Sequence, residues 1–329
     1  ELNLAKGLKF RSMFALEYGN NINEVFVPII YSNDLGSASD GYNNTSSFLN
    51  ENILTYSRDI GTDHNINLVA GYTAQTFAQR FESASVTGIS NNATENYDLS
   101  AASIINAPSN GISEWSLLSW LGRVNYTFKD RYLITASIRS DGSSRFGAQN
   151  KWATFPSAAI AWKVSEESFL KEVSFINDLK LRASYGVTGN TALSPYQSLD
   201  RLTSLRVVRG NETDEVGYVP ASLANADLKW ETTTQMDVGF DLTILNGNIE
   251  LTFDYYTKNT DNLLASVPLP PSLGFASSLK NIGEVQNKGI EIGLGATVSN
   301  QQFKWNLFGQ ISKNKNVVTR LAGDSDIFG

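Results

Sequence analysis

The sequence contains no cysteine, and its 329 residues include a single histidine, His64. Without cysteine the chain can form neither a disulfide nor a zinc–thiolate site, and it has no thiol nucleophile. With one histidine, a histidine-based metal site or a catalytic triad is not expected. We therefore predict no catalytic residue, no metal ion and no cofactor. His64 lies in the segment DIGTDHN and is expected to be a solvated turn residue.

Long apolar runs and basic clusters are also missing. No stretch of 18 consecutive apolar residues occurs, which excludes a transmembrane helix but not membrane-spanning strands of about ten alternating residues. The formal net charge is -7 and the sequence pI is about 4.9, so no nucleic-acid partner is expected. Charged residues make up only 18% of the chain and hydrophobic residues 41%, a ratio that argues against disorder.

What the sequence does contain is a period-two alternation of apolar and polar residues, which is typical of β-strands. In the segment YLITASI, for example, Tyr132, Ile134 and Ile138 share one parity while Thr135 and Ser137 share the other. The content of 17 Phe, 13 Tyr and 6 Trp favours strands as well. About eleven strands are predicted on this basis. They are expected near residues 8–18, 48–58, 65–80, 116–128, 132–139, 152–164, 179–187, 230–245, 249–260, 284–298 and 303–313.

Short and long links alternate between these predicted strands. The short links lie around IGTD, KDR, NGN and SNQQ, and the segment SEESFLKEVSFIND is a short-side link with room for one helical turn. The long links are expected near residues 19–47, 81–115, 140–151, 188–229 and 261–283. This alternation is typical of an antiparallel meander with one trimmed end, as in an outer-membrane barrel.

Aromatic residues accompany two of the short links. Phe128 and Tyr132 flank KDR, and Phe303 and Trp305 follow SNQQ on the same apolar parity. Such residues fit an interfacial girdle, in which amphipathic rings lie at the level of the lipid headgroups. The general preference of aromatic residues for strands explains them equally well.

The stretch SWLGRVNYTFKDRYLITASIRSDGSSRFG, with KWATFPSAAIAWKVSEESFL and LKLRASYGVTGN, closely resembles the barrel of SusC/RagA-type TonB-linked outer-membrane transporters of Bacteroidota. The runs LKWETTTQMDVGFDLTILNGNIELTFDYYTKNTDNLL and NIGEVQNKGIEIGL look like later strands of the same barrel, and the similarity covers most of residues 115–315. The resemblance implies an all-β, antiparallel transmembrane barrel of about 22 strands. We therefore expect residues 1–329 to be a partial barrel domain, from an excerpt or a truncated reading frame that lacks the plug and the remaining strands.

The resemblance also implies a location and partners. It implies a bacterial outer-membrane protein surrounded by lipid, a SusD-like lipoprotein as a lid on the extracellular side, and TonB acting through the absent plug. The implied function is import of a bulky nutrient, with an oligosaccharide as the expected class and a peptide or a siderophore as alternatives. No enzymatic activity is expected.

Alternation alone does not exclude other classes. A soluble or secreted carbohydrate-binding module or adhesin would bury the same apolar face between two sheets. The test is whether Val124, Ile134, Leu181 and Leu251 face outward from one sheet or converge between two. A sandwich hydrolase is a third reading, and it needs two opposed carboxylates about 5 to 9 Å apart. The adjacent Glu166 and Glu167 point apart and are expected to be solvated.

Aromatic residues in or beside the long links are candidates for contact with a sugar or peptide, although packing within the loops explains them as well. They are Tyr97, Trp115, Tyr196, Tyr218 and Trp230. On the polar parity, Asp254, Tyr256 and Lys258 are expected to point into a polar lumen.

The segment RSDGSSRFG, residues 139–147, combines glycine, serine and arginine as a phosphate-binding loop does. Such a loop needs a following helix, whose free N–H groups bind the anion. The next segment, KWATFPSAAIAW, alternates like a strand and contains Pro156. We therefore predict a connector on the long-link side, in which Asp141 and Gly142 form the turn and Arg139, Asp141 and Arg145 form ion pairs.

Overall fold

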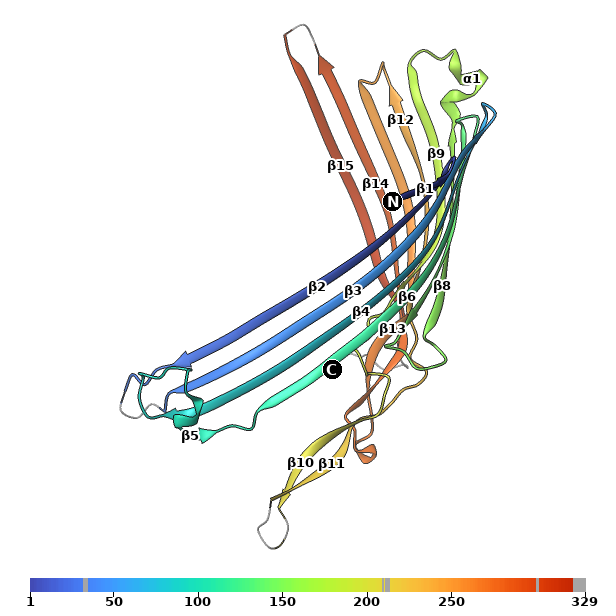
Figure 1. Cartoon of the computed structure of the whole chain (residues 1–329). Coiled ribbons are helices and arrows are strands. Elements are labelled where there is room, and N and C mark those ends of the chain that lie inside the picture. The colour runs from blue at the N-terminus through green and yellow to red at the C-terminus, as the bar shows by residue number, and fades with distance from the viewer. Residues whose placement is uncertain (32–34, 209, 211–213, 300–301, 322–329) are drawn as a thin grey trace. The chain divides into compact units, whose positions relative to one another are not determined.

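A computed structural model describes residues 1–31, 35–208, 210, 214–299 and 302–321 and is almost entirely antiparallel β-structure (Figure 1). Within the described residues there are eleven long strands. They are β2 (Leu8–Val27), β3 (Ser37–Ile60), β4 (His64–Ile89), β6 (Ser109–Phe128), β7 (Tyr132–Ser143), β8 (Trp152–Lys163), β9 (Ile176–Asn190), β12 (Glu231–Ile244), β13 (Ile249–Pro268), β14 (Ser277–Ser299) and β15 (Lys304–Arg320). Each of the eleven predicted strands is confirmed by one of them.

Short elements complete the fold. The short strands are β1 (Leu2–Ala5), β5 (Ala102–Ile105), β10 (Arg201–Val208) and β11 (Asp214–Ser222). The helical pieces are η1 (Leu99–Ala101), η2 (Val164–Glu166), α1 (Ser168–Lys171) and η3 (Pro271–Leu273). No helix in the described part of the chain is both long and apolar enough to cross a membrane.

The strands form a meander, because their order in the main sheet follows the chain. That order is β1-β2-β3-β4-β6-β7-β8-β9-β12-β13-β14-β15, with β5 paired to β4, while β10 and β11 form a separate two-stranded sheet. By contact density the chain divides into two compact units. Unit 1 comprises residues 1–11, 52–72 and 119–329, and unit 2 comprises residues 12–51 and 73–118.

The strands are longer than predicted at the ends that carry the long links. β2 continues to Val27 and β4 to Ile89, so the long connectors shrink to about half their predicted length or less in several cases. They occupy residues 28–36, 90–108, 144–151, 191–230 and 269–276. The added segments, such as GNNINEVFV in β2, carry polar residues on both parities. Backbone pairing continues there after the apolar alternation has stopped, and this is why the alternation underestimates strand length.

In unit 1, the apolar parity lies on a face that no second sheet covers within the described residues. Val124 is 45% exposed, Ile134 47% and Leu181 42%, and Leu251 on the same parity is half-buried. A soluble sandwich would bury these side chains in its core. The alternative of a soluble two-sheet module is therefore wrong, and the prediction of a single antiparallel sheet is confirmed.

The register aligns apolar residues across neighbouring strands of unit 1. Ile134 of β7 pairs with Ile160 of β8, and Phe240 of β12 pairs with Phe253 of β13, whose ring centroid lies 5.6 Å away. A one-residue slip would turn an entire strand's apolar set onto the polar face, so these pairs fix the register.

Candidate functional site

An aromatic row runs along the short-turn end of four consecutive strands in unit 1. The ring of His64 on β4 lies 5.0 Å from that of Phe128 on β6, and Phe128 lies 6.1 Å from Tyr132 on β7. Tyr132 in turn stacks on Trp162 of β8 at 6.3 Å. Phe128 and Tyr132 thus occupy the position expected of a girdle. Phe303 and Trp305, at the start of β15, are 62% and 63% exposed.

His64 is a member of this row, so the prediction of a solvated turn residue is wrong. It is the first residue of β4 and is half-buried. Its Nδ1 lies 2.8 Å from the hydroxyl oxygen of Tyr126, in hydrogen-bond contact. Proximity to the IGTD turn suggested exposure, but the neighbouring strand β6 supplies the partners that cover the ring.

Glu167 forms a hydrogen-bonding centre beside the row, so the prediction that it is solvated is also wrong. One carboxylate oxygen accepts hydrogen bonds from the Tyr132 hydroxyl at 2.6 Å and the Trp162 indole N–H at 3.1 Å, and the other accepts from Arg131 at 3.1 Å. Its side chain is only 14% exposed. Glu166 does remain half-exposed, in an ion pair with Lys171 at 3.4 Å.

These contacts favour the ionised form of Glu167. The hydrogen bonds from Tyr132 and then Trp162 hold the pKa of the carboxyl group below its ordinary value, with a further contribution from the Arg131 guanidinium. Because the pKa is lower in the folded state, this stabilisation is present above the ordinary carboxyl pKa and is lost as pH falls through the folded-state value.

We expect Glu167→Gln to lower the melting temperature near neutral pH, because glutamine keeps the shape but loses the charge that Arg131 pairs with. The difference in melting temperature between this variant and the wild type should narrow as pH falls from about 6 to about 3, because the wild-type carboxylate is progressively protonated over that range. Thermal unfolding followed across that pH range checks this. Glu166→Gln is the control and should show no comparable narrowing, and an unchanged gap at acid pH would contradict the assignment.

The polar face of β9, β12 and β13 carries an ion-pair network. Arg182 of β9 binds both carboxylate oxygens of Asp241, at 3.0 and 2.8 Å, and its Nη2 also lies 3.1 Å from Asp254 Oδ1 on β13. Gly239 of β12 lies between them in register. A Cβ at Gly239 would lie 2.2 Å from Asp254 Oδ1, so the missing side chain lets the guanidinium reach across β12.

This network bears on the predicted polar face and on the hydrolase reading. Asp254 is on that face, as expected, and the Tyr256 hydroxyl donates to Asn314 at 3.3 Å. Asp241 and Asp254 share one guanidinium and so belong to a single ion-pair network across three strands. No cluster of three or more potential metal ligands occurs in the described ranges.

At the long-link end of unit 1, a buried group that we call the loop core joins two connectors to β8. Phe146, Leu193, Leu228, Trp230 and Phe155 are each 7% exposed or less. The ring of Trp230 lies 5.1 Å from Phe146 and 5.6 Å from Phe155, and its indole N–H donates to the Lys151 carbonyl at 3.2 Å. These connectors are therefore packed against each other.

The segment RSDGSSRFG leads from β7 into this loop core. Arg139 Nε donates to both carboxylate oxygens of Asp141 at 2.8 Å, and Nη2 donates to Ser119. Arg145 Nη1 donates to the Leu193 carbonyl at 3.1 Å. The predicted turn position is wrong, because Asp141 and Gly142 are paired strand residues opposite Ala153 and Trp152. No helix follows, and so the segment lacks the feature that a phosphate-binding loop requires.

The five aromatic candidates have different surroundings. Tyr97 and Tyr218 are the most open, at 81% and 72% exposed, and Tyr196 is 37% exposed. Trp115 is half-buried on β6 and stacks on Phe77 at 5.6 Å. Trp230, at 5% exposed, packs inside the loop core with no face open to a ligand. Tyr97 and Trp115 belong to unit 2, and the other three to unit 1.

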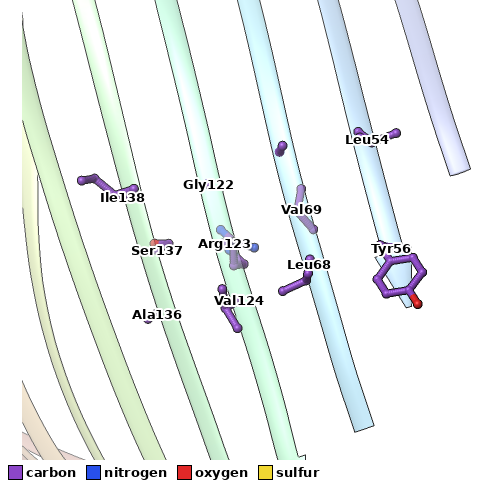
Figure 2. Close-up of a pocket in the computed structure, with 11 residues that line it drawn as sticks. Leu54, Tyr56, Leu68, Val69, Gly122, Arg123, Val124, Ala136, Ser137 and Ile138 are labelled. Carbon is purple, nitrogen blue, oxygen red and sulfur yellow. The ribbon is translucent and has the colours of Figure 1, made fainter. Parts of the chain in front are cut away.

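An apolar hollow of about 610 Å³ lies on the apolar face of β3, β4, β6 and β7 in unit 1 (Figure 2). Apolar side chains border it, and glycine and alanine leave space between them. The bordering side chains on this parity are Leu54, Tyr56, Leu68, Val124 and Ile138, and the small residues are Ala70, Gly122 and Ala136. Val69, Arg123 and Ser137, on the other parity, also contribute to the lining. No sequence pattern pointed to this hollow, because it depends on small residues that come together from separate strands.

Comparison with known proteins gives consistent matches. The family model described as TonB dependent receptor-like, beta-barrel, matches residues 2–326. TonB-dependent receptor P3 of Formosa agariphila is 38% identical over 98% of this chain and 32% of its own length. TonB-dependent receptor SusC of Bacteroides thetaiotaomicron is 39% identical over 64% of this chain and 22% of its own. The chain spans about a third of the length of the first curated relatives it matches.

A solved structure matches as well. The RagAB peptide transporter superposes with a TM-score of 0.89 at 25% sequence identity, over 97% of this chain and 36% of that one.

Proposed function

Since the chain belongs to the TonB-dependent receptor β-barrel family, and to its SusC/RagA type, we propose that it forms part of the wall of an active importer. Members of this family are outer-membrane β-barrel proteins, so the uncovered apolar face of the sheet lies against lipid. The whole of residues 1–329 would then be barrel, with a plug supplied by the longer protein. We propose no enzymatic step for it.

The observation that carries this proposal is the asymmetry between the two ends of the sheet. One end has short turns and the aromatic row, and the other has long connectors that close over a loop core. In outer-membrane barrels, the short turns are periplasmic and the long loops are extracellular. A substrate arriving from outside would therefore meet the loop-core end first.

We propose an oligosaccharide as the substrate class. Tyr97 and Tyr218 support it, because exposed rings on the long-loop side offer flat apolar faces of the kind that bind sugar rings. A peptide is the second candidate, because the similar RagAB assembly is a peptide transporter. A siderophore receptor is a third possibility within the class.

The proposed partners follow from the same family. A SusD-like lipoprotein would cover the extracellular side, and TonB would act on the plug of the full-length protein. The loop core gives such a lid a firm base, since connectors 144–151 and 191–230 are held together by buried side chains.

The test is deletion of the full-length gene, followed by growth and uptake assays on a panel of oligosaccharides, the corresponding monosaccharides and peptides. We expect loss of growth on an oligosaccharide and not on its monosaccharide. Loss of growth on peptides alone would make a peptide the substrate class. Normal uptake of every compound would contradict the proposed role in transport.

Point variants then test the two tyrosines. Tyr97→Ala and Tyr218→Ala should each raise the substrate concentration for half-maximal uptake by about threefold to tenfold, the effect of one lost ring contact. Leu205→Ala, on the exposed β10–β11 hairpin, is the control and should leave uptake unchanged.

A further inference from the structure

We propose that the apolar hollow binds one acyl chain of a glycerophospholipid from the periplasmic leaflet. The proposal depends on the chain's place in the outer membrane and not on the identity of the transported substrate. Its failure would therefore leave the transport proposal intact, and a failed transport assay would not decide it.

The hollow has the shape of an acyl-chain site. Leu54 and Leu68 border it from β3 and β4, and Val124 and Ile138 border it from β6 and β7. Gly122 leaves the space between them open. Lipid tails are as apolar as these side chains, so preference among sites comes from van der Waals contact and not from loss of water. A chain that lies in a hollow touches more protein atoms than one on a flat face.

The hollow also lies at a suitable depth. Val124 is four positions from Phe128 and Leu68 is four positions from His64, and Phe128 and His64 belong to the aromatic row. Four residues of extended strand span about 13 Å. If the row marks the headgroup level, the hollow lies in the half of the hydrocarbon layer on the short-turn side, where each half is about 15 Å thick.

A cation is present where the headgroup phosphate would lie. Lys129, in the β6–β7 turn, holds its Nζ 5.2 Å from the centroid of the Phe128 ring, on the lipid-facing parity. Its side chain is 47% exposed, and its ion pair with Asp63 is long, at 4.0 Å. The nearby Arg131 is engaged with Glu167. Lys129 is thus the basic group of this turn with capacity for a phosphate, and this charge complementarity favours a phospholipid over a neutral lipid or a second protein.

The experiment measures lipid retention by the full-length receptor that contains this chain. The receptor is purified in mild detergent, delipidated and re-equilibrated with phosphatidylglycerol, and bound lipid is counted by native mass spectrometry. Gly122→Leu fills the hollow, and its Cβ would have only Ile138 within 4 Å, at 3.6 Å, so the backbone need not move. Ala136→Leu fills it from β7. Ala158→Leu is the matched control, exposed on the same face and paired with Ala136 but outside the hollow.

We expect the wild type and Ala158→Leu to retain one tightly held phospholipid. The two filling variants should retain at least about fivefold less phospholipid than the wild type. Equal retention in all four proteins would overturn the proposal, as would equal loss from Ala158→Leu. A co-purifying protein that shields the hollow in place of lipid would overturn it too. Heat-dependent gel mobility verifies that each variant is folded, and either filling variant alone suffices for the comparison.

The headgroup contact is tested with a second pair of measurements. Lys129→Gln should lower retention of phosphatidylglycerol but not of diacylglycerol with the same acyl chains. Equal retention of both lipids by Lys129→Gln and the wild type would overturn the phospholipid assignment and leave a site for the acyl chain alone.

Discussion

Phe146→Ala is expected to open the loop core. The Phe146 side chain is 2% exposed and packs on the ring of Trp230, 5.1 Å away at the end of the 191–230 connector. Removing a buried phenylalanine costs about 3 to 5 kcal/mol through lost contacts and the cavity that remains. Because Phe146 lies in the loops, this cost should fall on the connectors and not on the sheet.

Limited proteolysis and hydrogen exchange measure this directly. In Phe146→Ala, we expect faster cleavage and faster exchange across residues 191–230, with unchanged exchange in the strands of the main sheet. Phe169→Ala is the control, because Phe169 is 65% exposed on α1 at the opposite end of the strands. If both variants were cleaved at the wild-type rate, the loop core would not be what holds these connectors.

The second large effect is expected for Gly239→Ala. The new methyl group would lie 2.2 Å from Asp254 Oδ1 and 2.5 Å from the Phe253 carbonyl oxygen, and the second of these is backbone that cannot rotate away. The Arg182–Asp254 contact would have to break and the β12–β13 pairing would have to shift. We estimate a loss of about 2 to 4 kcal/mol, given the cost of overpacking and of an ion pair whose members are about 30% exposed.

This loss of stability is measured as a fall in the temperature at which the full-length barrel no longer shows the gel mobility of its folded form. Gly295→Ala in β14 is the matched control, because its Cβ would meet only ordinary contacts, the nearest being Glu250 Cβ at 3.5 Å. The midpoint should fall for Gly239→Ala and stay near the wild-type value for Gly295→Ala. If Gly239→Ala left the midpoint unchanged, β12 would not need the space that the missing side chain of Gly239 leaves.

The middle of each long strand could be predicted from the sequence, whereas its end at the long links could not. Residues such as Ile134 and Leu181 alternate because one side of them meets lipid, and this produces the period-two pattern. Beyond that band both faces are polar, as in the end of β2 around Asn20, and nothing in the composition separates a paired strand from a loop. The β10–β11 hairpin was missed for a related reason, since its residues are exposed on both faces.

Side-chain sites were predictable only where the partners are near in sequence. The contact between Arg139 and Asp141 joins residues two positions apart. Glu167 and Tyr132 are 35 positions apart, and Arg182 and Asp254 are 72 apart. Such pairs depend on which strands become neighbours and in what register. For the same reason, Trp230 could be placed beside a long link from the sequence but not in the interior of the loop core.

The position of the loop core has a mechanical consequence for the β10–β11 hairpin. The buried residues Leu193 and Leu228 lie on either side of the hairpin in the chain and anchor both of its ends. Between these anchors and the hairpin, Ser198 is buried and donates to the Arg145 carbonyl at 2.9 Å, and Asn225 donates to the Leu279 carbonyl of β14 at 2.8 Å. A molecule that pushes on the hairpin would therefore load the 144–151 connector and β14 through these contacts, and not only β9 and β12, which continue the chain on either side.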